Sequence, residues 1–246
     1  MSVIFRGRRV LFLQSRPGDG PKPPPRPPCG YCGKPEHPFA PEWGSHIGNS
    51  MWLSEAILGG RETETHEWYT GRWSLAAHHL ICAEAMEDDE DWALYCRLYG
   101  YDINRGPNGV MLPSVMDVAC DLHVPVHRGN HAGGWAYDVN LAYPKAVMAL
   151  LKKVKKKLVS GAFCEAPEML TRELDRVSAL ILQKVERFVW TITSDGLDYQ
   201  EGGRGCGGER HIPEKTSRVC PLGRRHGAKH AGTGKPLVKR ALQVGR

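Results

Sequence analysis

Apolar side chains recur at helical spacing in four stretches of the chain. Helices are predicted over residues 50–58, 84–99, 141–159 and 167–191. The third stretch has the clearest pattern, since Pro144 suits a first turn and Gly161 suits a position just after the end. Its apolar positions form one stripe, made by Val147, Leu150, Leu151, Val154 and Leu158. The chain is therefore predicted to be mostly helical.

Two adjacent histidines, His78 and His79, stand in the stretch A-A-H-H-L-I-C. On an extended chain neighbouring side chains point to opposite faces, so one imidazole can face a metal while the other faces a substrate. His123, His127 and His131 follow at a spacing of four residues, and on a helix their imidazoles would stack on one face. A catalytic divalent ion usually has about three protein ligands. We expect His78 to be joined by two of the later histidines, with His123 open as the alternate ligand.

The segment from residue 76 to residue 139 resembles the AHH family of nucleases, part of the HNH/endonuclease VII group. The resemblance is carried by Ala77-His78-His79-Leu80-Ile81, by Asn108-Gly109-Val110-Met111-Leu112-Pro113 and by His127-Arg128-Gly129-Asn130-His131. It implies a ββα-metal core, in which a two-stranded hairpin and a helix hold a metal between them. The fold class that it implies is α+β, a mostly helical domain around this small hairpin–helix unit.

The same resemblance implies roles for individual residues. His79 would be the general base, His78 a metal ligand, and His127 and His131 ligands or phosphate contacts. Asn108 would hydrogen-bond backbone across the hairpin and hold the loop that presents His79, since an amide can both donate and accept.

Phosphodiester hydrolysis needs a deprotonated water and positive charge on the phosphate. A neutral imidazole at His79 can take the proton of water, and one divalent metal, Mg²⁺, Mn²⁺, Ni²⁺ or Zn²⁺, would supply the charge. Arg128 stands beside the histidines and could bind the same phosphate. Its alternative interpretation is an ordinary solvated arginine.

Each of these residues also has an ordinary structural interpretation. Buried histidines are often simply hydrogen-bonded to neighbours, and Asn108-Gly109 by itself indicates only a turn. From another functional class, the chain could be a zinc-stabilised nucleic-acid-binding module without catalysis. Such a module has no need of a free imidazole at His79. The ordered set of groups therefore favours a metal-dependent endonuclease, with DNA ahead of RNA as its substrate.

Eight cysteines raise the question of zinc or disulfides. Cys29 and Cys32, in C-G-Y-C-G-K, have the spacing of a zinc half-site. The missing ligands of a structural zinc would be His37 or His46, or else Cys206, His211 and Cys220. The remaining cysteines stand in apolar surroundings and are interpreted as buried small hydrophobes, namely Cys82, Cys96, Cys120 and Cys164.

Proline and charge divide the chain into three predicted parts. Residues 1–28 form an N-terminal arm and a proline-rich linker, residues 29–200 a nuclease domain with its core at 74–140, and residues 201–246 a basic, glycine-rich tail. The formal net charge of +6 comes from this tail, where 11 Lys and Arg stand against 3 Asp and Glu. A basic arm would speed encounter with nucleic acid, whereas a merely solubilising tail is the alternative.

The chain has no apolar stretch near the length of about 18 residues that a membrane span needs. Its N-terminus lacks the small-residue cleavage site of a signal peptide, so we expect a cytoplasmic protein, with any delivery to another cell by a route that needs no cleavable signal. The family resemblance further implies a bacterial toxin effector and, with it, a cognate immunity protein.

Overall fold

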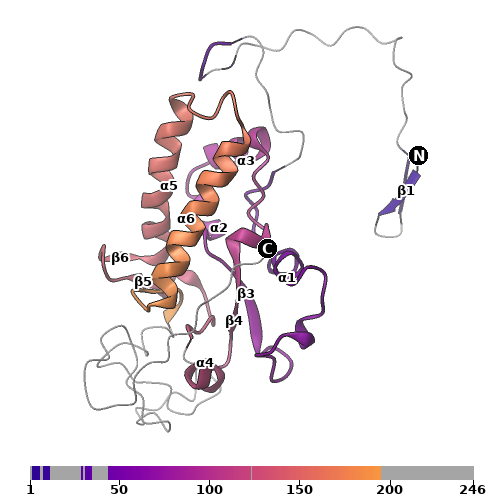
Figure 1. The fold of residues 1–246 in the computed structure, drawn as a ribbon, viewed down its shortest axis with the longest axis vertical. Coiled ribbons are helices and arrows are strands. Elements are labelled where there is room, and N and C mark those ends of the chain that lie inside the picture. Colours follow the sequence, from indigo (N-terminus) through magenta and orange to yellow (C-terminus); the bar gives the residue numbers. More distant parts are fainter. Residues whose placement is uncertain are drawn as a thin grey trace.

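Two antiparallel strands, β3 (Leu75–His79) and β4 (Gly109–Pro113), run through the centre of the structure (Figure 1). The structure is a computed structural model, and it describes residues 2–5, 8–11, 29, 31–34, 44–122 and 124–194. His78 lies opposite Val110 in the register of the two strands, and His79 lies opposite Gly109. The histidine pair thus occupies the last two positions of an extended strand.

The two faces of this strand pair contact different apolar clusters. Ala77 and Met111 pack with α1 (Ser50–Leu58) in a small cluster, whereas Val110 and Leu112 belong to the main core. Because side chains alternate along a strand, His78 shares the face of Val110 and turns toward the main core. His79 turns toward the side of α1.

Helix α1 begins and ends at residues suited to those positions. The side chain of Asn49 accepts hydrogen bonds from the backbone N–H groups of the first turn, and Gly59 ends the helix with a φ of 62°. The helix packs closely on β4 at Gly109, where a Cβ would lie 2.6 Å from the Cδ1 atoms of both Leu53 and Ile57. Glycine at this position therefore lets helix and strand approach.

The connection between the strands carries α2 (Ala83–Glu87), α3 (Asp91–Tyr99) and a short 3-10 helix, Gly106–Asn108. The single helix predicted over 84–99 is thus wrong, because it is interrupted at residues 88–90. Asp89 explains the interruption. Its side chain accepts from the backbone N–H of Asp91 and forms an ion pair with Lys155 of α5 (Tyr143–Val159), so it competes with a continuous helix.

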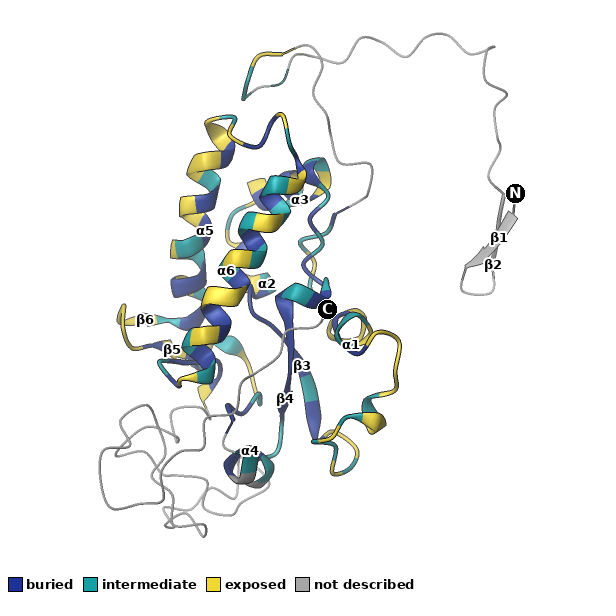
Figure 2. Cartoon of the chain, in the orientation of Figure 1, coloured by how far each residue is buried: buried dark blue, intermediate teal, exposed yellow. Residues whose placement is uncertain are grey.

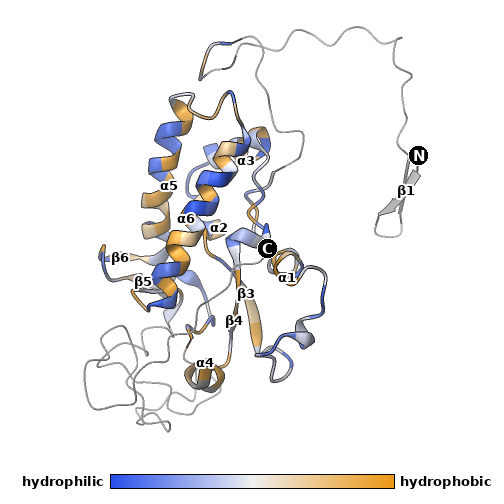
Figure 3. Cartoon of the chain, in the orientation of Figure 1, coloured by the Kyte–Doolittle hydropathy of each residue, from blue (hydrophilic) through white to orange (hydrophobic). Residues whose placement is uncertain are grey.

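Helices α5 and α6 (Glu168–Glu186) are the two longest of the described chain and lie side by side (Figure 1). Each has a buried stripe of mainly hydrophobic residues and an exposed face that is mainly hydrophilic (Figures 2 and 3). Both predicted helices are confirmed with shorter bounds. Leu141–Ala142 is strand β6 and Trp190–Thr191 is strand β7, and both pair with β5 (Trp135–Ala136).

The segment after β4 forms α4 (Met116–Leu122), which ends before the histidines. His127 lies in an irregular segment, and His131 begins a short 3-10 helix, His131–Gly133. No continuous helix therefore carries these imidazoles. Gly129 supplies the reason, since its φ of 90° is incompatible with a right-handed helix. His123 lies outside the described residues.

The fold class is α+β, as predicted, with helices around small antiparallel sheets. At the N-terminus β1 (Ser2–Phe5) pairs with β2 (Arg8–Leu11). The predicted proline-rich linker and the basic tail lie outside the described residues. Among the helices that are described, none combines the length and the apolar character needed to cross a membrane.

Candidate active site

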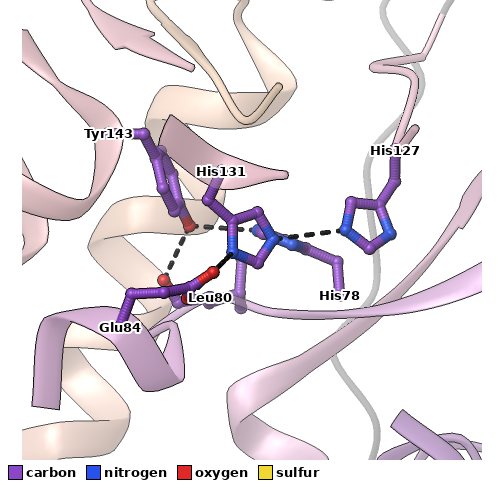
Figure 4. A network of polar contacts seen from close by, with 6 residues as sticks. All are labelled: His78, Leu80, Glu84, His127, His131 and Tyr143. Atoms are coloured by element: carbon purple, nitrogen blue, oxygen red, sulfur yellow. Dashed lines mark hydrogen bonds and ion pairs between the residues drawn. The ribbon is translucent and has the colours of Figure 1, made fainter. Parts of the chain in front are cut away.

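Three imidazoles from separate parts of the chain converge beside the end of β3. They belong to His78, to His127 of the irregular segment and to His131 of the 3-10 helix, and we refer to them as the histidine cluster (Figure 4). The ring centroid of His78 lies 4.8 Å from that of His127 and 5.0 Å from that of His131. Each ring offers one nitrogen, and these nitrogens all lie within 4.8 Å of one another. The cluster unites three of the residues proposed from the sequence as ligands.

The orientation of His78 is fixed by Tyr143, in the first turn of α5. The Tyr143 hydroxyl donates its one hydrogen to the carbonyl of Leu80 at 2.7 Å, and its oxygen lies 3.0 Å from Nε2 of His78 (Figure 4). The hydroxyl must therefore accept at this contact, which places the imidazole hydrogen on Nε2. Nδ1 of His78 is then the nitrogen with a free lone pair, and it is buried without a hydrogen-bond partner.

The orientation of His131 is fixed by Glu84 of α2. Nδ1 of His131 lies 2.9 and 3.0 Å from the two carboxylate oxygens, which can only accept, so this nitrogen carries the hydrogen. Nε2 of His131 is left with its lone pair and lies 3.2 Å from Nε2 of His127. The other ring nitrogen of His127 is buried without a partner.

The electrostatic surroundings keep the imidazoles of His78 and His127 neutral. Burial, followed by the neighbouring imidazoles, places the pKa of His78 well below its usual value. The same two causes lower the pKa of His127 to about 3. The carboxyl of Glu84 has its pKa lowered to about 2, chiefly by the hydrogen bond from His131, and is therefore ionised. Neutral imidazole is the form that binds a metal ion.

The histidine cluster fits a divalent cation. Two nitrogens bound to one tetrahedral zinc at about 2.0–2.1 Å would be about 3.3 Å apart, and the Nε2 atoms of His127 and His131 are 3.2 Å apart. Glu84 hydrogen-bonds one ring nitrogen of His131, and Tyr143 hydrogen-bonds one ring nitrogen of His78. Hydrogen bonds of this kind to the second ring nitrogen orient histidines that bind a metal through the first. The buried, unpaired Nδ1 of His78 supplies the remaining lone pair.

His79 lies on the other side of the strand and has a different partner. Its side chain is buried, and Nε2 lies 2.9 Å from Oδ1 of Asn104. The same oxygen accepts from the backbone N–H of Asn49, and Nδ2 of Asn104 donates to the carbonyl of Ile47 and to Asp102. These contacts fix the direction of the amide, so Nε2 of His79 must donate and Nδ1 keeps its lone pair.

The protonation of His79 suits a base. Burial lowers its pKa below the usual value, against the hydrogen bond to Asn104, which raises it. The residue keeps an exposed fraction of 8%, whereas that of His78 is 0%. The two neighbours therefore hold their free lone pairs in different surroundings, one in the histidine cluster and the other beside Asn104.

Asn108 is buried and uses its whole hydrogen-bonding capacity within the protein. Its Oδ1 accepts from the backbone N–H of Ile81 at 2.8 Å and from the Ser178 hydroxyl at 2.8 Å, and its Nδ2 donates to the carbonyls of Ile81 and Ile103. The side chain thus joins the chain after β3, the segment before β4, and α6. It has no group left for a metal.

The other residues proposed from the sequence lie as follows. Arg128 follows His127 directly and is half-buried. Cys29 and Cys32 lie together beside Cys164, and not with His46, while Cys206 and Cys220 fall outside the described residues. Cys164 is buried, as interpreted from the sequence, and its proximity to Cys29 and Cys32 was not predicted.

Three residues of the site were missed by sequence reasoning, namely Glu84, Asn104 and Tyr143. Glu84 is one acid among many in an acidic stretch, Asn104 stands in a polar turn, and Tyr143 begins an amphipathic helix. Their local patterns have ordinary explanations. A weak signal exists only for Tyr143, because a buried tyrosine requires a hydrogen-bond partner.

Comparison with known families bears directly on this arrangement. Residues 60–181 match the model of AHH, a nuclease family of the HNH/ENDO VII superfamily with a conserved AHH motif. This part of the chain belongs to the AHH nuclease family. Neither a curated protein nor a solved structure shows a significant match to the chain.

The AHH region includes the whole site described above. It begins before β3, reaches into α6, and contains both histidines of the pair, the other two histidines of the cluster, and their partners Glu84, Asn104 and Tyr143. The substrate class of an AHH nuclease is nucleic acid.

Proposed function

We propose that the protein is a metal-dependent endonuclease that hydrolyses phosphodiester bonds of DNA. The observation that carries the proposal is that the adjacent residues His78 and His79 have different partners. His78 joins two further imidazoles whose free nitrogens converge, whereas His79 is held separately by Asn104 with a lone pair on Nδ1. Nucleic-acid hydrolysis needs both parts, a cation site and a base.

His79 is the proposed general base. It is neutral at physiological pH because burial lowers its pKa, and its Nδ1 can accept the proton of an attacking water. Asn104 keeps the ring in place through Nε2–H, and the same contact stabilises the imidazolium that forms when Nδ1 is protonated. Asn108 is proposed to hold the backbone on either side of the pair.

His78, His127 and His131 are the proposed metal ligands, with Tyr143 and Glu84 as orienting partners. A divalent cation bound there would supply positive charge for the scissile phosphate and the leaving oxygen. Arg128, next to His127, is the proposed additional phosphate contact. Imidazole ligands favour Ni²⁺ and Zn²⁺ over Mg²⁺ in affinity, although the ion that supports turnover can be Mn²⁺ or Mg²⁺.

The test is cleavage of supercoiled plasmid DNA by the purified full chain. Nicking should require added Mg²⁺, Mn²⁺, Ni²⁺ or Zn²⁺, stop with EDTA, and disappear in His79→Ala while the variant still binds metal. His78→Ala should instead weaken metal binding. His66→Ala is the matched control, because His66 bonds the backbone N–H of Trp68 and belongs to neither group.

The outcomes separate the proposal from its main rival. If a folded, metal-loaded chain cleaves neither DNA nor RNA, or if both His78→Ala and His79→Ala remain active, the endonuclease assignment fails. A non-catalytic nucleic-acid-binding module would bind DNA with the same affinity in wild type and His79→Ala. Cleavage of RNA alone would keep the chemistry and change the substrate.

The family resemblance extends the proposal to a bacterial toxin effector with a cognate immunity protein. Expression in a bacterial host should then arrest growth, and His79→Ala should relieve the arrest. A wild-type chain that is expressed, active in vitro and harmless to the host would remove the toxin role and leave the nuclease proposal intact.

A further inference from the structure

Cys29 and Cys32 lie against the loop that joins α5 to α6, where Cys164 stands. Sγ of Cys29 is 3.9 Å from Sγ of Cys164, although the two residues are 135 positions apart in the sequence. The sulfurs of Cys29, Cys32 and Cys164 all lie within 4.8 Å of one another. We refer to these three residues as the cysteine cluster.

The N-terminal half of the cluster is a tight turn that directs backbone N–H groups at sulfur. The N–H of Tyr31 donates to Sγ of Cys29 at 3.4 Å, and the N–H of Cys29 donates to the carbonyl of Lys34 at 3.0 Å. Gly33, with a φ of 68°, closes the turn by donating to the carbonyl of Cys29. N–H groups that point at sulfur stabilise a thiolate, the form that binds metal.

The second half of the cluster is shaped to receive this turn. Gly161 has a φ of 80°, and the place where its Cβ would stand is 3.5 Å from Cβ of Cys32 and 3.7 Å from Sγ of Cys164. An ion pair between Lys34 and Glu165 joins the same two segments, and an edge contact between Tyr31 and Tyr95 fixes the turn to α3 as well. The approach of the three sulfurs is therefore supported by contacts around them.

The sulfur spacing distinguishes a metal site from a disulfide. A disulfide needs an S–S distance of about 2.03–2.05 Å, and all three cysteines are free thiols here. Two thiolates bound to one tetrahedral zinc at about 2.3 Å would be about 3.8 Å apart. The distance of 3.9 Å between Cys29 and Cys164 agrees with the second case.

We propose that Cys29, Cys32 and Cys164 bind a structural zinc ion that fixes Cys29 and residues 31–34 to the α5–α6 loop. The ion takes three thiolate sulfurs, and a water molecule or another side chain completes its tetrahedron. Binding releases the thiol protons and adds its free energy to that of folding, since the unfolded chain does not hold the three sulfurs together. Coordination of the same ion by Cys29 and Cys164 also closes a loop of 135 residues, which lowers the conformational entropy of the unfolded chain.

This site is independent of the proposed nuclease activity. Its ligands are sulfurs, whereas the histidine cluster offers nitrogens from other segments. One thiol, that of Cys82, lies near Glu84 and His131, so the thiol readout is assigned to the cysteine cluster through variants of Cys29 and Cys164.

The experiment is a Co²⁺ titration of the metal-free full chain, prepared under reducing conditions. Wild type should develop the near-ultraviolet absorption of thiolate-to-cobalt charge transfer, and added Zn²⁺ should abolish it. Cys29→Ala and Cys164→Ala should each lose most of this absorption. Each variant should also bind one zinc ion fewer per chain than wild type. Cys96→Ala, which removes a buried cysteine outside the cluster, and His78→Ala should both keep it.

A second measurement on wild type covers the case in which a variant fails to fold. A mercurial reagent that binds thiols should release zinc from the native protein, and hydrogen exchange in peptides spanning 158–166 should rise at the same time. The proposal is overturned if wild type shows no thiolate absorption, if a disulfide joins two of these cysteines in the freshly purified protein, or if Cys164→Ala behaves like Cys96→Ala.

Discussion

The imidazole of His78 and the phenol of Tyr143 form a hydrogen bond of 3.0 Å between two side chains that are both fully buried. The phenol can only accept at this contact, because its hydrogen goes to the carbonyl of Leu80. Tyr143 thereby selects the nitrogen of His78 that carries a lone pair. The first turn of α5 is thus coupled to the orientation of a proposed metal ligand at the end of β3.

Replacing Tyr143 with phenylalanine tests this coupling. Tyr143→Phe leaves the Nε2–H of His78 and the carbonyl of Leu80 unpaired, so the free energy of unfolding should fall by about 1–3 kcal/mol. Metal affinity should fall about 10- to 100-fold because the ring is no longer held in one tautomer. Isothermal titration with the divalent ion measures the affinity, and urea denaturation measures the stability. Tyr137→Phe, at an exposed tyrosine, is the control and should change neither value by much.

The carboxylate of Glu84 should contribute to metal affinity through its charge as well as its hydrogen bond. Glu84→Gln can still accept from Nδ1–H of His131 but lacks the charge, whereas Glu84→Ala lacks both. The expected order of metal affinity is wild type, then Gln, then Ala, with Ala about 10- to 100-fold weaker than wild type. Equal affinities in all three proteins would remove Glu84 from the site. Glu87→Gln, on an exposed position of the same helix, provides the matched control.

Asn108 should be chiefly a determinant of stability. Asn108→Ala leaves two buried carbonyls, one N–H and the Ser178 hydroxyl without their partner, and each unpaired group costs about 1–3 kcal/mol. Chemical denaturation should therefore show a loss of at least about 3 kcal/mol. Ser178→Ala removes only one of these contacts and should cost about 1 kcal/mol. A loss in Asn108→Ala no larger than in Ser178→Ala would show that water replaces the amide.

The sequence predicts those features of the site that depend only on residues adjacent in the chain. His78 and His79 face different sides because any strand alternates its side chains, and that prediction needs no tertiary information. The later histidines show the limit of such reasoning. Their spacing of four would stack the rings on a helix, yet Gly129 turns the chain. The rings of His127 and His131 stack without a helix, with centroids 5.4 Å apart.

Partners that lie far away in the sequence could not be predicted. Tyr143 is 65 residues from His78, and Glu84 is 47 residues from His131. Each looks ordinary in its own segment, as one acid among several or one apolar position of a helix. Cys164 is the strongest example, because only the packing of the α5–α6 loop brings it to Cys29. The fold class, by contrast, followed from helical periodicity together with the family motif.

Asn104 should control the rate of cleavage without controlling metal binding. Asn104→Ala removes the acceptor for Nε2–H of His79, and a misplaced base should lower kcat about 100-fold while KM and metal affinity change little. Asn104→Asp also loses the amide donors to Ile47 and Asp102, but it keeps an oxygen for His79. Both variants lose these donors, and the Asp variant also sets a carboxylate against that of Asp102, but it alone keeps the acceptor. Single-turnover cleavage should be distinctly faster in the Asp variant, and equal rates would show that Asn104 acts only through folding.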